Sequence, residues 1–345
     1  MFKDILHSSQ SVFKDIMVLD YDFQPDRIEY RENEQREIAK AVAPLIKGYP
    51  GKTLFVHGIP GIGKTTAVKQ VMRELESHDI TTLYVNCWDD HSTHKVLAKL
   101  CYLLGNPFVQ HKPTNELLLT FKSLCTQPVV LVLDEIDKLE DTDVLYTLFE
   151  SISVKTIIML TNYRSAYKKI DERVRSRLHT EFLEFKPYTR EEIEGIMKKR
   201  VQYAFVQQPL NILPSVIDTC HAVHDVRVGL YILREAGLNA ENSNMTTITQ
   251  EHVEMAISKV HDFYVKPVQQ LDDDLTMILN IVKQCSGNNI GDVYLVYQQH
   301  GGSQSYRSFQ RKIAKLADGK FIRTEKGKGR GNTTVLHYAV IEQGA

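Results

Sequence analysis

The stretch that most constrains this chain is LFVHGIPGIGKTTAVKQVMREL, which begins at Leu54. It starts as a short apolar strand and continues into a Gly-x-x-x-x-Gly-Lys-Thr loop that ends at Gly63, Lys64 and Thr65. A helical pattern follows at once, with three apolar side chains on one face: Val68, Val71 and Leu75. A strand, a glycine-rich loop and a helix in this order predict a phosphate-binding loop.

The residue types in this loop suit a nucleotide. Glycines let successive backbone N–H groups turn inward around the phosphates, and the helix N-terminus adds its dipole. Lys64 is expected to reach the β- and γ-phosphates, and the Thr65 hydroxyl to ligate Mg²⁺. The loop residues predicted to bind the cofactor, ATP or ADP, are Ile59, Pro60, Gly61, Ile62, Gly63, Lys64, Thr65 and Thr66.

A phosphate loop needs an acidic partner at the tip of a neighbouring parallel strand, and PVVLVLDEIDKL supplies one. Its apolar run, 129–133, is typical of a strand buried on both faces. We expect Asp134 to hold Mg²⁺ directly or through water, and Glu135 to orient and polarise the attacking water. An acidic pair after a strand is often only a helix N-cap, but here the two motifs occur in the expected order.

Polar and basic residues follow in two further segments. The strand pattern KTIIMLTN ends in Asn162, which is expected beside the γ-phosphate as its detector. The stretch KKIDERVRSRL carries Arg173, Arg175 and Arg177, for which a solvated helix end is an equal alternative. Arg227 begins an amphipathic helix within a separate helical segment, 189–262.

Length and composition place these motifs in a multidomain globular chain. With 345 residues we expect two or three domains, and 43% hydrophobic and 25% charged residues are ordinary for a soluble protein. The first residues include acidic side chains and no long apolar run, so we expect no secretory signal or membrane span and a cytoplasmic location. The five scattered cysteines are interpreted as buried reduced thiols.

Charge is unevenly distributed although the net charge is only −1. The stretch 303–338 holds nine basic and two acidic residues, so the rest of the chain is acidic. After the polar linker YVKPVQQLDDD, a helical pattern restarts at 272–274, a second helix spans 291–300, and the Gly301-Gly302-Ser303 turn precedes a third. This spacing is typical of a helix-turn-helix, and the asymmetry indicates a C-terminal end that faces nucleic acid.

The third helix sorts its residues onto two faces. Its predicted core stripe is Tyr306, Phe309, Ile313 and Leu316. Its predicted DNA-reading face is Ser308, Arg311, Lys312 and Lys315, although a merely solvated basic face remains the alternative. FIRTE and TTVLHYAV suit two strands, and the KGKGRGN between them predicts a wing tip with three DNA-contacting residues: Lys326, Lys328 and Arg330.

The order of motifs resembles an AAA+ ATPase and, more narrowly, the archaeal initiator family related to the origin recognition complex and the cell-division-cycle helicase loader. LDYDFQPDRIEYRENEQREIAKAVAPLI resembles the family's N-terminal box, and VNCWDDHSTHKVLAKLCYLLG resembles the start of its initiator-specific helical insertion. IDERVRSRLHTEFLEFKPY and HDVRVGLYILREAG resemble its arginine-finger and second-sensor regions. The resemblance runs from about Leu19 onward.

The resemblance implies roles for particular residues. Asn162 takes the first-sensor role, Arg227 the second, and Arg177, rather than Arg173, is the favoured arginine finger acting on ATP of a neighbouring protomer. Pro25 and Tyr188 are implied in the adenine pocket. Members of the family often have Gly-Asp where this chain has His224-Asp225.

The resemblance also implies a second DNA contact in the helical insertion, near 94–124. Its turn, GNPFVQHKPT, holds few charges, so contact there would involve backbone N–H groups, Lys112 and apolar wedging. Core packing is an equal alternative for Phe108.

The sequence therefore predicts an N-terminal extension (1–18), an α/β P-loop AAA+ domain (19–186) with that insertion, an all-α lid (187–265) and a winged helix (266–345). The implied function is an ATP-dependent replication initiator and weak ATPase used as a switch. Its implied partners are double-stranded origin DNA, the replicative minichromosome maintenance helicase and other initiator protomers; no membrane partner is implied. The implied location is the cytoplasm, in association with the nucleoid. The alternatives are a signalling ATPase whose winged helix contacts proteins and a transcription regulator or plasmid replication factor; a clamp-loader subunit is disfavoured.

Overall fold

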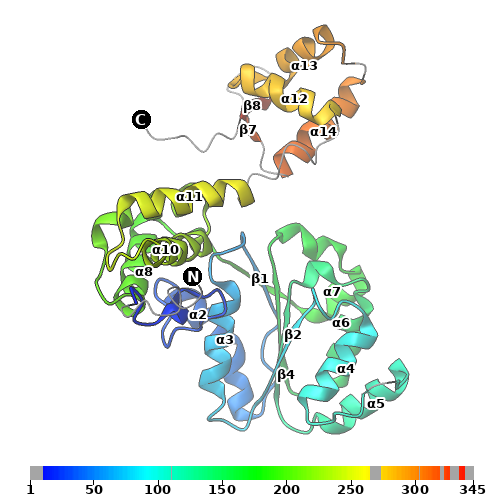
Figure 1. Cartoon of the computed structure of the whole chain (residues 1–345). Coiled ribbons are helices and arrows are strands. Elements are labelled where there is room, and N and C mark those ends of the chain that lie inside the picture. Colours follow the sequence, from blue (N-terminus) through cyan, green and yellow to red (C-terminus); the bar gives the residue numbers. More distant parts are fainter. Residues whose placement is uncertain are drawn as a thin grey trace. The chain divides into compact units, whose positions relative to one another are not determined.

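The structure is a computed structural model, and it describes residues 11–109, 111–264, 273–302, 304–318, 322–326 and 334–338. The chain divides into two compact units, Met1–Val253 and Glu254–Ala345, which are considered separately below (Figure 1).

A five-stranded parallel sheet forms the centre of the first unit. Its strands are β1 (Leu54–His57), β2 (Thr81–Asn86), β3 (Val129–Asp134), β4 (Lys155–Thr161) and β5 (Glu181–Glu184), in the order β2-β3-β4-β1-β5. β1, β3 and all of β4 except its first residue are buried, as their continuous apolar runs predict. The expectation that the acidic strand neighbours the phosphate-loop strand is wrong, because β4 lies between β1 and β3.

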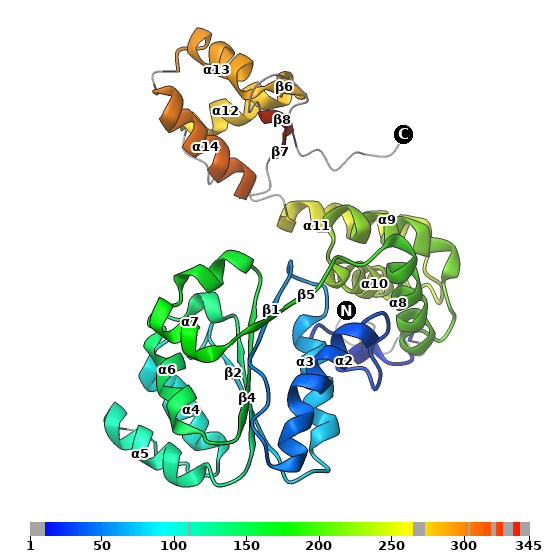
Figure 2. The same ribbon diagram turned by 180° about the vertical axis from the view of Figure 1, so that it is seen from behind.

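Helices cover both faces of this sheet. Figures 1 and 2 show α2 (Glu32–Val42) and α3 (Lys64–Leu75) on one face, and α4 (Thr93–Leu103), α6 (Asp143–Ser151) and α7 (Glu172–Leu178) on the other. α5 (Thr114–Leu124) forms a hairpin with α4, and its Leu117 and Phe121 belong to the same core as the second face. Short 3-10 helices fill connections: η1 (Ile16–Leu19), η2 (Ala43–Lys47), η3 (Ile136–Lys138) and η4 (Arg164–Lys169).

A helical bundle follows the sheet. It contains α8 (Arg190–Ala204), η5 (Leu210–Ile212), α9 (Leu213–Val223) and α10 (Val226–Asn242). The next helix, α11 (Gln250–Tyr264), begins in this unit and continues along the chain into the second. α8 begins at a capping box in which Thr189 and Glu192 satisfy each other's backbone N–H groups. Between α9 and α10, His224 adopts a left-handed backbone conformation with φ of 55°. Glycine would adopt this conformation without steric cost, whereas a residue with a Cβ does not.

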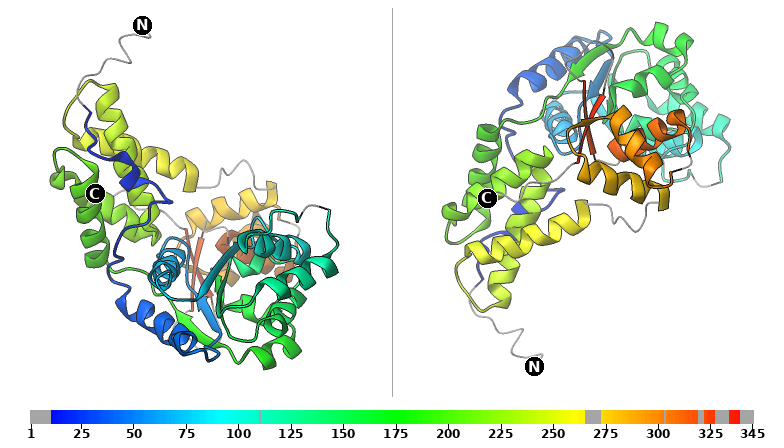
Figure 3. Two further views of the ribbon diagram at one scale, coloured as in Figure 1. Left: turned by 90° about the horizontal axis from the view of Figure 1, so that it is seen from below. Right: turned by 90° about the horizontal axis from the view of Figure 1, so that it is seen from above.

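The N-terminal segment, residues 11–19, packs against the helical bundle (Figure 3). The Phe13 ring stacks on Phe205, and the position of a Gly237 side chain is occupied by the Phe13 ring. Arg200 donates to the Val18 carbonyl at 2.9 Å. Residues 11–19 therefore pack as part of the bundle.

Beyond α11, the elements of the second unit have the order helix, strand, helix, helix, strand, strand, which is the order of a winged helix. Its elements are α12 (Asp273–Gln284), β6 (Asn288–Asn289), α13 (Ile290–Gln299), α14 (Tyr306–Asp318), β7 (Ile322–Lys326) and β8 (Thr334–Tyr338). β8 pairs antiparallel with both β6 and β7. Three residues of the predicted core stripe are buried, namely Phe309, Ile313 and Leu316, whereas Tyr306 is 40% exposed and lies edge-on to Tyr294.

Candidate nucleotide site and nucleic-acid interface

The carbonyl groups of the phosphate loop are held by protein donors. Lys64 Nζ donates to the carbonyls of Gly58 and Ile59, at 2.7 and 2.9 Å, and to Asn162 Oδ1 at 2.9 Å. Burial lowers the pKa of Lys64 to about 8, although Glu135 and Asp134 act in the opposite direction. The lysine therefore lies where β4 and the loop meet, next to two acidic residues.

Two glycines of the loop are required by their surroundings. Gly61 has φ of +76°, and a Cβ there would lie 1.9 Å from Asp225 Oδ1. Gly63 has φ of +86°, and its Cβ would lie 2.9 Å from the Tyr188 hydroxyl. Any other residue would be strained at both positions, so the loop stays a bare backbone cradle whose N–H groups can surround an anion.

Side-chain oxygen atoms of the kind that coordinate Mg²⁺ lie together at the same edge of the sheet. Thr65 Oγ1 donates to Asp134 Oδ2 at 2.7 Å. Thr65 lies in the first turn of α3, directly after the loop that follows β1, and Asp134 ends β3; the contact therefore forms although β4 lies between β1 and β3. The Tyr84 hydroxyl donates to the same Oδ2 at 2.8 Å. A hydroxyl and a carboxylate are oxygen ligands of the kind that a hard cation such as Mg²⁺ prefers.

Glu135 and Asn162 form a second polar pair beside the lysine. The Asn162 amide donates to both carboxylate oxygens of Glu135, at 3.1 and 3.0 Å. Burial raises the pKa of Glu135, and the hydrogen bond from Asn162 partly opposes this. Glu135 also has a left-handed backbone with φ of 53°, an uncommon conformation for a non-glycine residue that is typical of functional sites.

The helical bundle contacts the loop through the start of α10. Val226 N–H donates to the Gly61 carbonyl at 3.3 Å. Asp225 caps α10 and holds Arg227 through a pair of close contacts, 2.7 Å from Nη2 to Oδ2 and 3.0 Å from Nε to Oδ1. The expected second sensor is therefore beside the phosphate loop, with its guanidinium on Asp225.

The two expected adenine-pocket residues, Pro25 and Tyr188, lie near opposite ends of α3. The Pro25 carbonyl accepts from Arg73 Nη2 at 3.0 Å, so Pro25 lies near the C-terminal end of α3. Tyr188 is 7% exposed, and the guanidinium of Arg31 lies 3.8 Å from its ring centroid. One face of the Tyr188 ring is thus covered by an arginine.

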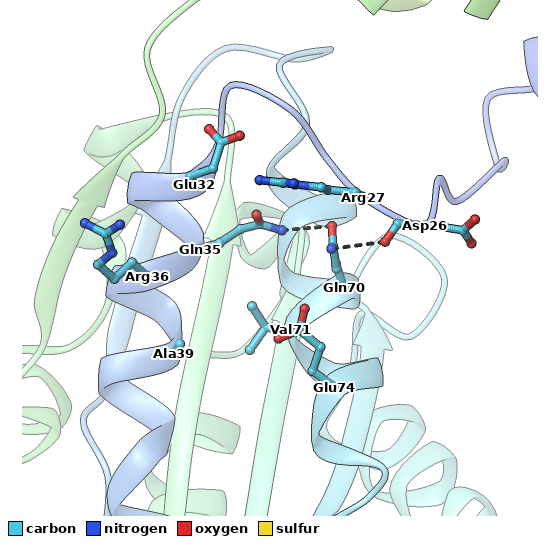
Figure 4. A pocket seen from close by; sticks show the side chains of 9 residues that line it. All are labelled: Asp26, Arg27, Glu32, Gln35, Arg36, Ala39, Gln70, Val71 and Glu74. Atoms are coloured by element: carbon cyan, nitrogen blue, oxygen red, sulfur yellow. Dashed lines mark hydrogen bonds between the residues drawn. The ribbon is translucent and has the colours of Figure 1, made fainter. Parts of the chain in front are cut away.

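A cavity of about 420 Å³ lies between α2 and α3 (Figure 4). Its lining residues are Asp26, Arg27, Glu32, Gln35, Arg36, Ala39, Gln70, Val71 and Glu74. Gln70 is already satisfied there, accepting from Ile28 N–H and Gln35 and donating to the Asp26 carbonyl. None of the predicted nucleotide-binding residues lines this cavity, although Asp26 directly follows Pro25.

The two candidate arginine fingers differ in their surroundings. Arg177 Nη1 lies 2.6 Å from Glu150 Oε1 on α6, and its guanidinium lies over the Tyr146 ring. The Arg173 side chain is 93% exposed, and its Nε lies 3.5 Å from Asp171 Oδ1. Arg173 is therefore the more available of the two for a neighbouring molecule.

The helical insertion places its turn on the surface. Phe108 is 79% exposed, so core packing is the wrong interpretation for this residue. Lys112 pairs with Glu116 at 2.7 Å, and its carbonyl contacts His94 Nε2. The α4–α5 hairpin thus exposes an aromatic tip, while the charge of Lys112 is partly neutralised.

The basic residues of α14 are not equivalent. Arg311 and Lys315 are exposed, and Ser308 is half-buried beside Ser305. Lys312 Nζ lies 2.5 Å from Asp274 Oδ2, and the Tyr297 hydroxyl donates to the other oxygen of Asp274 at 2.6 Å. Lys312 therefore helps to join α14 to α12.

The wing hairpin is defined by its strands. β7 and β8 pair from Ile322 with Tyr338 to Lys326 with Thr334. Lys328 and Arg330 lie outside the described residues, and for Lys326 only the backbone is described.

Three polar residues of the site were not found by sequence reasoning: Arg31, Tyr84 and Asp225. Tyr84 lies between the apolar residues Leu83 and Val85 in a strand-like stretch, TTLYVN, and this alternation could have indicated that its side chain faces away from the core. Asp225 precedes an amphipathic helix and is an expected N-cap. For Arg31 no spacing indicates that an arginine is buried.

Matches to family models agree with this geometry. Residues 49–168 match the model described as AAA domain, and residues 194–258 match the Cdc6 AAA+ ATPase-type lid domain. The phosphate loop, the acidic strand tip and the helical lid therefore define an AAA+ ATPase with a lid of the Cdc6 type.

Similar proteins narrow the class. ORC1-type DNA replication protein 1 of Methanothermobacter thermautotrophicus is 30% identical over 96% of this chain and 95% of its own length. The protein of the same name from Archaeoglobus fulgidus is 28% identical over 99% of this chain and 93% of its own length. The chain belongs to this family, the archaeal Orc1/Cdc6 type of replication protein.

Solved structures share the fold. The Aeropyrum pernix ORC1 protein in complex with DNA has a TM-score of 0.67 at 24% identity and covers 94% of this chain and 93% of that one. The ORC2 protein of the same organism, in ADPNP–ADP complexes, has a TM-score of 0.76 at 18% identity, with coverage of 95% and 94%. Among the described residues, no helix combines the length and apolar character needed to cross a bilayer.

Proposed function

We propose that this protein is an ATP-dependent DNA replication initiator that binds double-stranded origin DNA and recruits or loads the replicative helicase. The observation that carries the proposal is the contact between the lid and the phosphate loop, in a chain of the ORC1-type family. Val226 N–H donates to the Gly61 carbonyl, and Arg227 is the next residue. A change of nucleotide at the loop would therefore bear directly on the lid.

The residues of the site have distinct proposed roles. Lys64 and the loop N–H groups bind the phosphates, and Thr65 and Asp134 would hold Mg²⁺, which when bound neutralises phosphate charge. Glu135 accepts the proton of the attacking water and Asn162 orients Glu135. Arg227 leaves Asp225 for the γ-phosphate, because phosphate offers the planar guanidinium a second bidentate partner.

ATP turnover is proposed to be weak and to act as a switch. Both carboxylate oxygens of Glu135 accept from the Asn162 amide, which restrains the proposed base. A neighbouring protomer would supply an arginine finger, and the exposure of Arg173 favours that residue over Arg177. Neutralising charge on the departing phosphoryl group is the role of such a residue.

DNA binding is proposed to use the second unit and the α4–α5 hairpin. Arg311 and Lys315, exposed on α14, would contact bases and phosphates in the major groove. Ser308 and the predicted wing residues Lys326, Lys328 and Arg330 are proposed to add further contacts. Lys312 would contribute mainly by joining α14 to α12. Phe108 would act as an apolar wedge at a deformable step, near Lys112.

The partners follow from this role. They are origin DNA, the minichromosome maintenance helicase and further initiator protomers, and the place of action is the cytoplasmic nucleoid.

The proposal is tested by two variants measured side by side. Lys64→Ala should lose ATP and ADP binding while keeping its circular dichroism spectrum. Arg311→Ala/Lys315→Ala should retain nucleotide and reduce the slope of log K for DNA against log salt by up to about two, since each phosphate contact contributes roughly 0.9. Normal nucleotide binding by the first variant, or an unchanged salt slope in the second, would contradict the proposal.

A further inference from the structure

Arg31 is a buried arginine that contacts three parts of the nucleotide-binding unit. It is 3% exposed and stands immediately before α2. Its Nε donates to the Ile62 carbonyl at 3.1 Å, its Nη2 to the Lys186 carbonyl at 2.8 Å, and its Nη1 to Glu34 at 2.9 Å. Burying a guanidinium is costly unless its donors are satisfied, so this set of partners fixes its position closely.

The Ile62 carbonyl belongs to the peptide that also carries the Gly63 N–H. A peptide is planar and trans, so its C=O and N–H point in opposite directions. Holding the Ile62 oxygen on Arg31 therefore directs the Gly63 N–H to the opposite side of the loop. Gly63 accommodates this with φ of +86°, a conformation that favours glycine, and the Tyr188 hydroxyl would lie 2.9 Å from any Cβ placed there.

Three further carbonyls of the loop also accept from protein donors. Gly58 and Ile59 carbonyls accept from Lys64, and the Gly61 carbonyl accepts from Val226 N–H. With these oxygens engaged by protein donors, the N–H groups of the loop form the concave side. Successive backbone N–H groups in such a turn are an anion-binding nest.

We propose that Arg31 is a positioning residue for the diphosphate of a nucleoside di- or triphosphate. It fixes the peptide between Ile62 and Gly63 in the orientation that presents the Gly63 N–H to the β-phosphate. This role rests on the proposed nucleotide function of the loop. Arg31 lies outside the loop motif, yet nucleotide binding by the loop would depend on it.

Arg31 also bears on the lid. Lys186 lies between the end of β5 and the start of α8, in the stretch of chain that leads from sheet to lid. The same guanidinium therefore fixes both the phosphate loop and the base of the lid. A lysine would not reproduce this, because one ammonium on a flexible stem lacks the planar fork that reaches two carbonyls while stacking on Tyr188.

The test compares Arg31→Met and Arg31→Lys with Arg36→Met, a control on the exposed side of α2. Binding of fluorescent ADP and ATP is titrated, AMP is used as a competitor, and thermal unfolding is followed without nucleotide. We expect Arg31→Met to weaken ADP and ATP by equal factors of about ten- to a hundredfold, the size of a lost hydrogen bond to a charged group. AMP, which lacks the β-phosphate, should compete as it does for the wild type.

Arg31→Lys should recover part of the affinity, and Arg36→Met should bind within about twofold of wild type, as expected for a surface change. In ATP hydrolysis, Arg31→Met should raise KM and leave kcat within about twofold. The reason is that the variant loses phosphate binding that contributes equally to the substrate complex and to the transition state. In the wild-type protein, the amide resonance of Gly63 should shift on ADP addition, a readout independent of any variant's folding.

Each result has a defined meaning. ADP binding within twofold of wild type by a folded Arg31→Met protein, equal loss of AMP, or an unmoved Gly63 amide resonance would overturn the role of Arg31. Undiminished ADP binding by Lys64→Ala would instead overturn the proposed nucleotide function, so the two failures are distinguishable.

Discussion

Asn162 and Glu135 are joined by two hydrogen bonds, from one amide nitrogen to both carboxylate oxygens at 3.1 and 3.0 Å. The oxygen of the same amide accepts from Lys64 at 2.9 Å. A single side chain at the tip of β4 therefore connects the lysine expected to bind the γ-phosphate with the carboxylate expected to activate water. Removing it should affect both.

Asn162→Ala should shift the acid limb of ATP hydrolysis to higher pH. Burial raises the pKa of Glu135 and the Asn162 hydrogen bond lowers it, so loss of that bond should raise the pKa further. A protonated carboxyl cannot accept the water proton, so the inactive acidic range would extend further upward in the variant than in the wild type. Single-turnover hydrolysis measured across pH checks this, with Tyr163→Phe as the control on the adjacent exposed residue. An unmoved acid limb in Asn162→Ala would show that the bond does not control Glu135.

ADP binding should take up protons above neutral pH. The pKa of Lys64 is about 8, below its ordinary 10.5, because of burial. Above pH 8 the free lysine is largely neutral, and phosphate favours its charged form, so binding should draw in up to about one proton and weaken by as much as tenfold per pH unit. Calorimetry at about pH 9 in two buffers of different ionisation enthalpy measures the uptake. Binding enthalpies that do not depend on the buffer would contradict the assignment.

Arg173→Ala and Arg177→Ala should separate function from stability. Arg173 is 93% exposed, so its loss should leave folding unchanged and slow ATP turnover only where protomers associate, as on DNA. Arg177 contacts Glu150 and the Tyr146 ring, so its loss should lower stability by up to about 1 kcal/mol, the usual size for a surface ion pair. Turnover at rising protein concentration, together with urea denaturation, distinguishes them. The opposite pattern would identify Arg177 as the finger.

His224→Gly should stabilise the lid. His224 adopts φ of 55°, which costs a non-glycine residue of order 1–3 kcal/mol, while glycine loses about 0.5–1 kcal/mol of additional chain entropy on folding. A net gain of about 1 kcal/mol is therefore expected in urea denaturation. His224→Ala keeps the strain and serves as the matched control. If glycine and alanine behave alike, the backbone conformation is not what limits stability there.

The sequence was informative wherever a local pattern decides the structure. β1, the loop and α3 follow from one contiguous stretch, and the buried side chains Phe309, Ile313 and Leu316 follow from helical spacing. In both places the interactions lie within a few turns of each other along the chain, so propensity and periodicity agree with the fold.

Long-range features were not predictable in this way. The insertion of β4 between β1 and β3 is a matter of sheet order, which the individual strand patterns do not specify. Arg31 contacts Ile62 and Lys186, 31 and 155 positions away, so nothing near it in the chain indicates its burial. The exposure of Phe108 likewise depends on how the α4–α5 hairpin meets the rest of the unit.

The measurement that tests the central claim most directly is a footprint of the purified protein on fragmented DNA from its own genome, with ATP, with ADP and without nucleotide. We predict protection of a small set of sites that changes between ATP and ADP, is lost in Arg311→Ala/Lys315→Ala, and loses its nucleotide dependence in Lys64→Ala. Protection that is uniform along the DNA, or a set of sites that ignores both the nucleotide and the α14 substitutions, would contradict the account.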